Sequence, residues 1–226
     1  MRCERKYRFD ASRQIALSLF EQISLGKLCD LAARLDTRHW IPATSSNLSL
    51  RRDPTSFLIS RSGKHKRGLH PSDFLLVDLH GKPAAAMAPK PSDETLLHAL
   101  IYRRCPWISC IIHCHAPELE HLRPPSVSLT GHELLKALGH KSHETGQLIH
   151  VYENSQDMHA LSTHIEQSQF TKVQPQANAT SRPVFFVLAQ HGIYCGGATI
   201  DKAEAVLEAL LHLLKHSVIE QHVEEQ

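Results

Sequence analysis

The chain has 226 residues, which suits one medium-sized domain or at most two small ones. With 42% hydrophobic and 21% charged residues it has the composition of an ordinary soluble globular protein, and a net charge of +2 indicates no surface for nucleic acid or an anionic membrane. No run of about 18 apolar residues, long enough for a transmembrane helix, is present. From the charge and this absence together, we expect neither a nucleic-acid nor a membrane partner.

The cysteines and the N-terminal stretch bear on the cellular compartment. The six cysteines form no CxxC pair, and several lie in apolar segments such as "WISCIIHCH". We interpret them as reduced thiols rather than disulfides or ligands of a zinc knuckle. The charged stretch "MRCERKYRFDASRQ" is followed by no apolar core of the signal-peptide type, which favours a cytoplasmic protein.

In the first half of the chain, residues 12–36 carry apolar side chains at helical spacing and predict one or two packed helices. A loop with a proline follows, and then come three stretches typical of strands, at 47–51, 55–63 and 73–82. The proline-broken stretch 82–92 predicts a loop. The next helix has its N-cap candidate in Ser92 or Asp93 and ends before Pro106.

The second half of the chain mixes strands and helices. In order, it predicts a buried strand at 107–115, a short helix from Pro117 to about His121, a short helix at 131–139, a strand at 146–153, a helix at 155–167 capped by Ser155, a polar connection at 168–182, two strands joined by a turn at 191–192 within 183–197, and an amphipathic helix at 199–223. Several strands are joined by hairpin-like turns, which favours a mixed or antiparallel sheet covered by helices.

His113 and His115 stand at the end of the buried strand 107–115. Side chains at positions i and i+2 of a strand point to the same face, so the two imidazoles lie side by side and Cys114 faces the other way. Such a pair suits two ligands of one zinc or related divalent ion. A chain with 18 histidines also produces such a pair by chance, so a purely structural pair remains open at this point.

His191 is the candidate third ligand, because it follows a buried strand and precedes a glycine where the backbone must turn. His140, His143 and His150 are rival third ligands. The simpler interpretation of His191 is an ordinary turn residue.

Five motifs together carry a resemblance to a known family. They are "ATSSNLSLR", "ISRSGKHKRGLHPSDFLLVDLHG", "KPSDETLLHALIYRRCPWISCIIHCHA", "LTGHELLKAL" and "LAQHGIYCGG", between about residues 27 and 216. Their order and spacing resemble the class II aldolase/adducin superfamily, and within it most nearly the dehydratases that act on 5-methylthioribulose 1-phosphate in methionine salvage. The resemblance implies a single domain over residues 1–226, with a three-layer α/β/α fold around a central mixed, largely antiparallel sheet.

The resemblance also implies a Zn²⁺ ion held by His113, His115 and His191, and a ketose 1-phosphate as substrate. As a Lewis acid, zinc makes the C3 proton removable. Loss of the C4 hydroxyl as water then requires a proton from a carboxyl group.

Two glutamates are candidates for this proton transfer. Glu133 matches the catalytic glutamate of the dehydratases by position, and it is the first candidate. Glu94 matches the acid/base carboxylate of the related sugar-phosphate aldolases. The alternative for each is a carboxylate in the first turn of a helix, where the helix dipole favours it.

The residues that match the phosphate-contacting loops of the family are Asn47, Ser62, Gly63 and Ser92. Lys64 and Lys66 add charge near them, although lysines are more often solvated surface residues. Two departures stand out. Ser46 occupies a position that is commonly glycine, where serine is strained if φ is positive. Ala189-Gln190 stands where relatives often carry arginine or glycine, which bears on a subunit contact or on the substrate tail.

Other interpretations of the same motifs remain. One is a class II sugar-phosphate aldolase or epimerase, which would break or remake the C3–C4 bond. Another is a metal-free interaction module of the adducin type, which the presence of all three histidines and both glutamates argues against. The resemblance further suggests a homotetramer with sites near the subunit borders.

Overall fold

The computed structural model describes residues 17–85, 89, 91–140, 142, 144–170 and 182–224. Within them, eight strands form a sheet in the order β3-β2-β1-β4-β8-β7-β6-β5. The strands are β1 Asn47–Asp53, β2 Ser56–Ser60, β3 Phe74–Asp78, β4 Cys110–Cys114, β5 Ser126–Leu129, β6 Gln147–Tyr152, β7 Val184–Leu188 and β8 Gly192–Gly197. Neighbouring strands pair antiparallel except β6 and β7, which pair in parallel. The mixed, largely antiparallel sheet is therefore confirmed.

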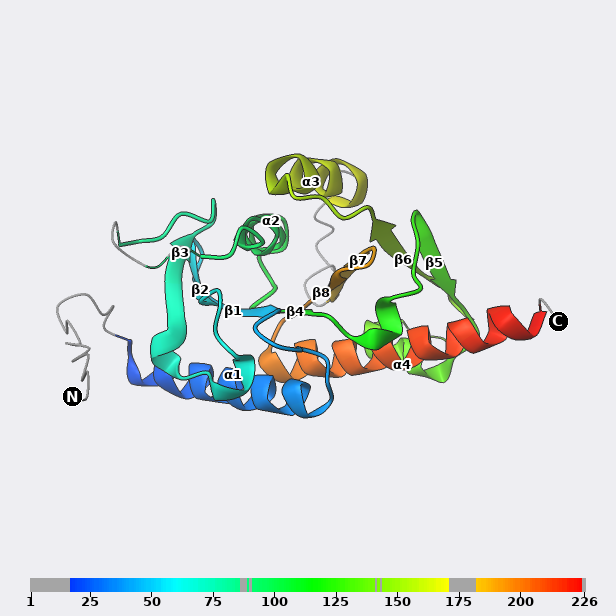
Figure 1. The fold of residues 1–226 in the computed structure, drawn as a ribbon, viewed down its shortest axis with the longest axis horizontal. Helices are drawn as coiled ribbons and strands as arrows, with labels where there is room; N and C mark the ends of the chain where they lie inside the picture. Colours follow the sequence, from blue (N-terminus) through cyan, green and yellow to red (C-terminus); the bar gives the residue numbers. More distant parts are fainter. Residues whose placement is uncertain are drawn as a thin grey trace, which may run out of the picture.

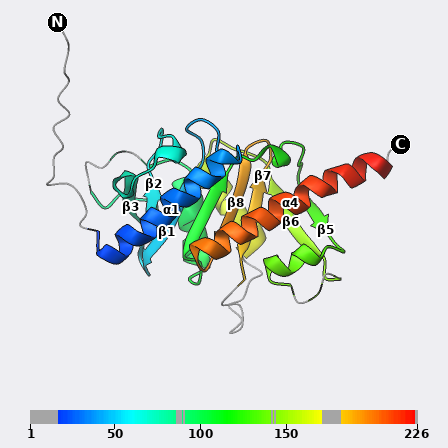
Figure 2. The same cartoon turned by 90° about the horizontal axis from the view of Figure 1, so that it is seen from below.

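Helices cover both faces of the sheet (Figure 1). The long helices α1 (Leu19–Thr37) and α4 (Ile200–Glu224) lie on one face, and both run across the sheet in Figure 2. The shorter helices α2 (Thr95–Arg104) and α3 (Met158–Ile165) lie on the other face. This arrangement confirms the three-layer α/β/α architecture. None of the described helices is long and apolar enough to cross a membrane.

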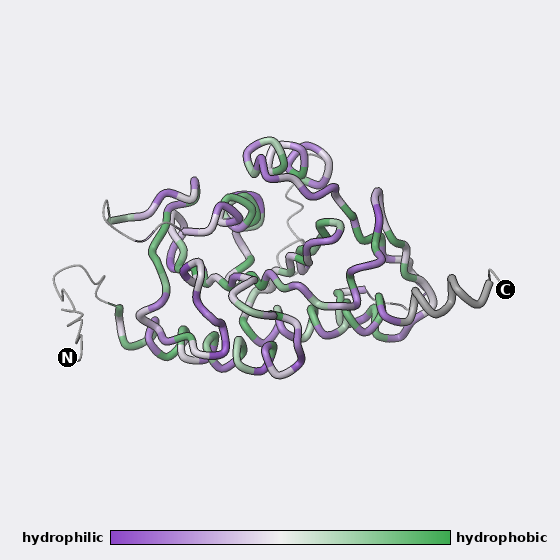
Figure 3. Tube along the Cα trace, viewed as in Figure 1, coloured by the Kyte–Doolittle hydropathy of each residue, from purple (hydrophilic) through white to green (hydrophobic). Residues whose placement is uncertain are grey.

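The two long helices are amphipathic, and the start of α1 is capped. Ser18 and Glu21 form a reciprocal capping box at the start of α1. In Figure 3 hydrophobic and hydrophilic residues alternate along the coloured parts of α1 and α4, as in helices that pack one face on a sheet. A two-pronged ion pair from Arg34 to Glu204, with nitrogen–oxygen distances of 2.9 and 2.6 Å, joins α1 to α4.

Strand β4 lies in the middle of the sheet and all five of its residues are buried. Cys110, Ile112 and Cys114 belong to the hydrophobic core that includes residues of α1 and α4. Ile111 belongs to the second core, which includes residues of α2 and α3. By the alternation of a strand, His113 points to the same side as Ile111, toward α2.

The starts of two helices differ from the prediction. Helix α2 begins at Thr95, and its N-cap is Glu94 rather than Ser92 or Asp93. The Glu94 side chain does not cap the helix because it turns toward His191. Helix α3 is capped by Asp157, whose Oδ1 accepts a hydrogen bond from the backbone N–H of Ala160 at 2.9 Å, and not by Ser155.

Other differences concern short elements. Strand β5 was not predicted, because four residues of which only Leu129 is buried give little signal until they pair with β6. The predicted helices after Pro117 and at 131–139 are 3₁₀ segments, Pro117–Leu119 and Glu133–Leu138. Residues 12–16 and most of the predicted polar connection at 168–182 lie outside the described part of the chain.

Candidate metal centre

Strand β4 covers Cys110–Cys114 within the predicted 107–115, so His113 lies in the strand and His115 directly follows it. The rings of His113 and His115 lie with their centroids 4.7 Å apart. His113 is opposite Asn47 of β1 and Tyr194 of β8 in the sheet register. The ring of Tyr194 stacks on His113, with 4.2 Å between centroids and 15° between planes. This packing restricts how the His113 ring is aimed.

The third imidazole comes from the turn between β7 and β8. The His191 ring lies 5.1 Å from that of His113 and 4.8 Å from that of His115. Gly192, the next residue, leaves no room for a side chain. A Cβ atom there would lie 2.3 Å from the carbonyl oxygen of Cys114 and 2.8 Å from the His113 ring. The glycine therefore lets the turn approach the end of β4 closely enough for the three rings to meet.

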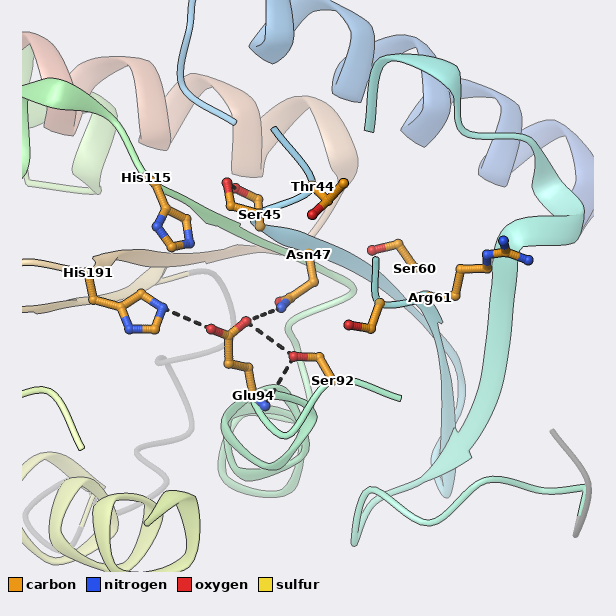
Figure 4. A pocket seen from close by; sticks show the side chains of 11 residues that line it. Thr44, Ser45, Asn47, Ser60, Arg61, Ser92, Glu94, His115 and His191 are labelled. Atoms are coloured by element: carbon orange, nitrogen blue, oxygen red, sulfur yellow. Dashed lines mark hydrogen bonds and ion pairs between the residues drawn. The ribbon is translucent and has the colours of Figure 1, made fainter. Parts of the chain in front are cut away.

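Glu94, at the start of α2, completes the cluster. One ligand atom from each of Glu94, His113, His115 and His191 lies within 4.8 Å of all the others. The Oε1 atom of Glu94 is 2.8 Å from Nε2 of His191 and 3.8 Å from Nε2 of His113. Figure 4 shows Glu94 between His191 and the polar residues Asn47 and Ser92.

Neighbouring groups orient the histidine rings for metal binding. Nδ1 of His113 lies 3.0 Å from the carbonyl oxygen of Ile193, which can only accept a hydrogen bond, so Nδ1 carries the proton and the Nε2 lone pair faces the cluster. Nδ1 of His191 is 3.0 Å from Oδ1 of Asn154. The Nε2 atoms of His113 and His115 are buried and have no hydrogen-bond partner among the described residues. Two orphaned nitrogens aimed at one point fit a metal ion.

The protonation states suit the same ligand set. Burial lowers the pKa of His115 to about 4 and the pKa of His113 well below its usual range, so both rings are neutral at neutral pH. Burial alone would raise the pKa of Glu94, but the hydrogen bond with His191, the nearby imidazoles and the hydrogen bond from Asn47 outweigh it and hold that pKa low. Neutral imidazoles and an ionised carboxylate are the forms that bind a divalent cation.

A polar pocket of about 270 Å³ opens beside this cluster. Three of the four residues predicted to contact phosphate line it, namely Asn47, Ser62 and Ser92, and the fourth, Gly63, follows Ser62 in the chain. The other lining residues are Thr44, Ser45, Ser46, Ser60, Arg61, Glu94, His115 and His191. The pocket thus combines small hydroxyl and amide groups with one end of the histidine cluster.

The lysines near the pocket differ from the expectation of solvated surface residues. Lys64 pairs with Asp73, with 2.6 Å between Nζ and Oδ2. Lys66 is only 1% exposed, and its ammonium donates hydrogen bonds to the carbonyl oxygens of Thr44, at 3.1 Å, and Lys64, at 2.8 Å. The expectation was therefore wrong for Lys66, because backbone carbonyls from two loops replace its water shell.

Glu133 is not part of this cluster within one chain. It begins the 3₁₀ segment Glu133–Leu138, its side chain is 69% exposed, and it forms an ion pair with Lys136. It does not line the pocket. The structure of a single chain therefore brings Glu94, and not Glu133, next to the three histidines.

The rival histidines do not reach the cluster. His140 interacts with Gln147, with 2.6 Å between Nε2 and Oε1. His150 belongs to β6 and lies against Tyr152. His143 lies outside the described residues.

Both sequence departures fall on unusual backbone. Ser46 has a φ of +71° and Gln190 a φ of +53°. Glycine adopts this left-handed conformation without steric cost, whereas serine and glutamine do not. Ser46 therefore has the positive φ at which a serine is strained.

Several residues around the candidate centre were not predicted. Tyr194, which packs on His113, and Asn154, which contacts His191, gave no signal because their roles depend on strand register and on a distant loop. His98 is different, since it lies four residues after Glu94 on α2 and so on the same helix face. That spacing was visible in the sequence.

The match of the sequence to a known family defines the class of this protein. The chain belongs to the class II aldolase and adducin family, since the family's sequence model, the Class II Aldolase and Adducin N-terminal domain, matches residues 26–218. Among its relatives is methylthioribulose-1-phosphate dehydratase of Acidiphilium cryptum (strain JF-5), 36% identical over 193 residues that cover 83% of this chain and 86% of the relative.

Two further comparisons agree with this assignment. Methylthioribulose-1-phosphate dehydratase of Methylococcus capsulatus (Bath) is 37% identical over 191 residues, covering 83% of this chain and 89% of that protein. The solved structure of L-fuculose-1-phosphate aldolase from Thermus thermophilus has a TM-score of 0.66 at 19% identity and covers 91% of this chain and 99% of that one. At this identity the structural likeness shows the shared fold alone.

Proposed function

We propose that the chain catalyses the zinc-dependent dehydration of 5-methylthioribulose 1-phosphate to 2,3-diketo-5-methylthiopentyl 1-phosphate in methionine salvage, as a lyase. The observation that carries the proposal is the convergence of three imidazoles and a carboxylate beside a pocket of hydroxyl and amide groups. Identity of 36% to a dehydratase over most of the chain supports this substrate.

Zinc is the metal we propose. Three imidazoles with room for further ligands are typical of catalytic zinc sites. When bound, zinc would supply the Lewis acidity that polarises the substrate carbonyl and makes the C3 proton removable.

The polar end of the pocket suits the phosphate group. We assign phosphate binding to Asn47, Ser62, Gly63 and Ser92, where short side chains let donors close on the phosphate oxygens. Arg61 also lines the pocket and adds a positive charge at its exposed rim. The cluster and these groups together fix both ends of a short phosphorylated sugar.

Two carboxyl groups divide the proton transfers in this proposal. Glu94 lies among the histidines and takes the proton from C3. Glu133 donates a proton to the C4 hydroxyl, which leaves as water, and the resulting C3 enol converts to the second ketone. Because Glu133 is exposed in its own chain, it acts here on the pocket of a neighbouring copy in a homotetramer.

We also propose a cytoplasmic location. Cys29, Cys105, Cys110, Cys114 and Cys195 are all free thiols, which is usual in a reducing compartment.

The test is a metal analysis joined to a substrate assay on the full chain. We expect about one zinc per chain and conversion of 5-methylthioribulose 1-phosphate to a diketone phosphate. Release of a short aldehyde without a diketone would instead identify a sugar-phosphate aldolase, whose fold this chain shares. A protein without metal or turnover would support the adducin-type module.

A further inference from the structure

A buried chain of hydrogen bonds runs from Glu94 into the protein, away from the pocket. Nδ2 of Asn47 donates to Oε2 of Glu94. The Oδ1 atom of the same amide contacts Nε2 of His98. Nδ1 of His98 lies 2.7 Å from the hydroxyl of Ser49, and that hydroxyl lies 2.8 Å from the hydroxyl of Tyr102.

These residues are deeply buried and come from two elements. Asn47 and Ser49 belong to β1 and point to the same face of it, whereas His98 and Tyr102 lie one turn apart on α2. His98 is 0% exposed and Asn47 is 2% exposed. Buried polar groups in such a chain hold one arrangement, because each broken link would leave a donor or acceptor without water.

The donor and the acceptor of every hydrogen bond in this series follow from the groups at its two ends. The Glu94 carboxylate only accepts, so the Asn47 amide must turn its NH₂ toward Glu94 and its oxygen toward His98. His98 must then donate through Nε2. Burial lowers the pKa of His98 to about 3, so the ring is neutral and has a single N–H.

The remaining links complete the same direction. With its one proton on Nε2, His98 accepts at Nδ1 from the Ser49 hydroxyl. Ser49 in turn accepts from Tyr102, whose other available acceptor, the carbonyl oxygen of Ser109, is more distant at 3.3 Å. Every donor in this series of hydrogen bonds therefore points toward Glu94.

We propose that His98 is a positioning residue, whose Nε2–H holds the Asn47 amide and thereby fixes Oε2 of Glu94 away from the cluster and Oε1 toward it. Oε1 is the atom that approaches His191 and His113. His98 also packs edge-on against Tyr194, with 5.6 Å between ring centroids, and Tyr194 stacks on His113. The buried ring of His98 thus holds the Glu94 carboxylate through Asn47. It also supports the candidate ligand His113 through Tyr194.

The inference has a test that needs no enzyme assay. In protein labelled with ¹⁵N-histidine at neutral pH, the ring of His98 should be neutral and protonated at Nε2, and His98→Gln identifies its signals. A proton on Nδ1, or a doubly protonated ring, would overturn the proposal.

The kinetic part of the inference rests on the proposed function. His98→Phe keeps an aromatic ring but removes both hydrogen bonds, and kcat should fall about 10–100-fold while the zinc content of the protein stays unchanged. His98→Gln retains an N–H donor and should recover much of the loss. Unchanged kcat in His98→Phe would contradict the positioning role.

A matched control separates positioning from general destabilisation. Leu161 belongs to the same hydrophobic core as α2 but makes no contact in the chain of hydrogen bonds, so Leu161→Ala should lower Tm without lowering kcat. Equal losses of kcat in both variants would argue against a specific role. If the wild-type chain does not convert the substrate at all, the proposed function fails, and the histidine spectrum alone decides the place of His98.

Discussion

At the scale of single residues, the tightest constraint on the metal centre is the contact between Gly192 and the end of β4. The turn that carries His191 passes so close to Cys114 and His113 that a methyl group has no place there. The three candidate imidazole ligands can therefore meet only if position 192 has no side chain.

We expect Gly192→Ala to lose most of its bound metal and to unfold at a lower temperature, because the new Cβ would push the turn away from His113. Metal analysis and thermal unfolding measure both effects. Gly26→Ala is the matched control, since nothing lies within 4 Å of its Cβ position in α1. That control should keep its metal and gain up to about 1 kcal/mol. Full metal content in Gly192→Ala would show that the turn adapts.

Ser46 offers the opposite case, in which a glycine should help. Its φ of +71° is costly for serine, so we expect Ser46→Gly to stabilise the protein by about 1 kcal/mol. Urea denaturation measures the change. Ser45→Gly serves as the control, because Ser45 is not among the residues with positive φ and its hydroxyl bonds to the carbonyl oxygen of Pro42 at 2.6 Å. A loss of stability in both variants would show that Ser46 is not strained.

At the scale of elements, Lys66 joins two pocket loops that are distant in sequence. Its ammonium binds the carbonyl oxygens of Thr44, just before β1, and of Lys64, after β2. Burial lowers the pKa of Lys66 to about 8 and the negative charge of Glu94 opposes that shift, so the ammonium stays charged at neutral pH. The loops on either side carry several of the residues that line the pocket.

Lys66→Met should therefore destabilise the fold by about 2–3 kcal/mol, the usual cost of lost hydrogen bonds to a charged group, and raise KM for the phosphorylated substrate. The zinc content should not change, because the histidines lie on other elements. Thermal unfolding and steady-state kinetics provide the readouts. The surface lysine Lys82, changed to Met, is the control and should behave as wild type. If Lys66→Met behaved like the Lys82→Met control, Lys66 would not hold the two pocket loops together.

Some features of these elements could be predicted from the sequence, and others could not. The strand pattern and the spacing of His113 and His115 predicted β4 and the shared face, because strand alternation is a local property. The burial of Lys66 and the packing of Tyr194 on His113 were not predictable, since both depend on segments that meet only in the folded sheet. The start of α2 was placed too early, because Glu94 gives up helix capping to face the histidines.

At the scale of the whole molecule, the position of Glu133 decides how the site is completed. The exposed carboxyl lies outside the pocket of its own chain, so the proposal assigns it to the pocket of a second copy. The resemblance to the family predicted this glutamate by position, but one chain's sequence could not say which pocket it serves.

Mixing of inactive variants tests this arrangement. Copies carrying His115→Ala and copies carrying Glu133→Gln, expressed together, should regain about a quarter of wild-type activity if neighbours are drawn at random. Each active site would combine intact histidines from one copy with Glu133 from the other. Sedimentation should show a tetramer.

The control mixture joins His115→Ala with Glu94→Gln. Both residues belong to the same cluster, so no intact site can form and activity should stay absent. If the first mixture is equally inactive, Glu133 does not act across a subunit border.

The alternation along β4 also determines which donor atoms the candidate centre offers to a metal. Cys114 stands between two ligands in the chain, yet its sulfur lies in the core on the opposite side of the sheet, and burial keeps the thiol protonated by raising its pKa. The centre therefore presents nitrogen and oxygen donors without sulfur, which disfavours soft ions such as Cu(I). A slip of one residue in the pairing of this strand would exchange both imidazoles for a single thiol, so the register of the sheet sets the donor atoms that a metal would meet.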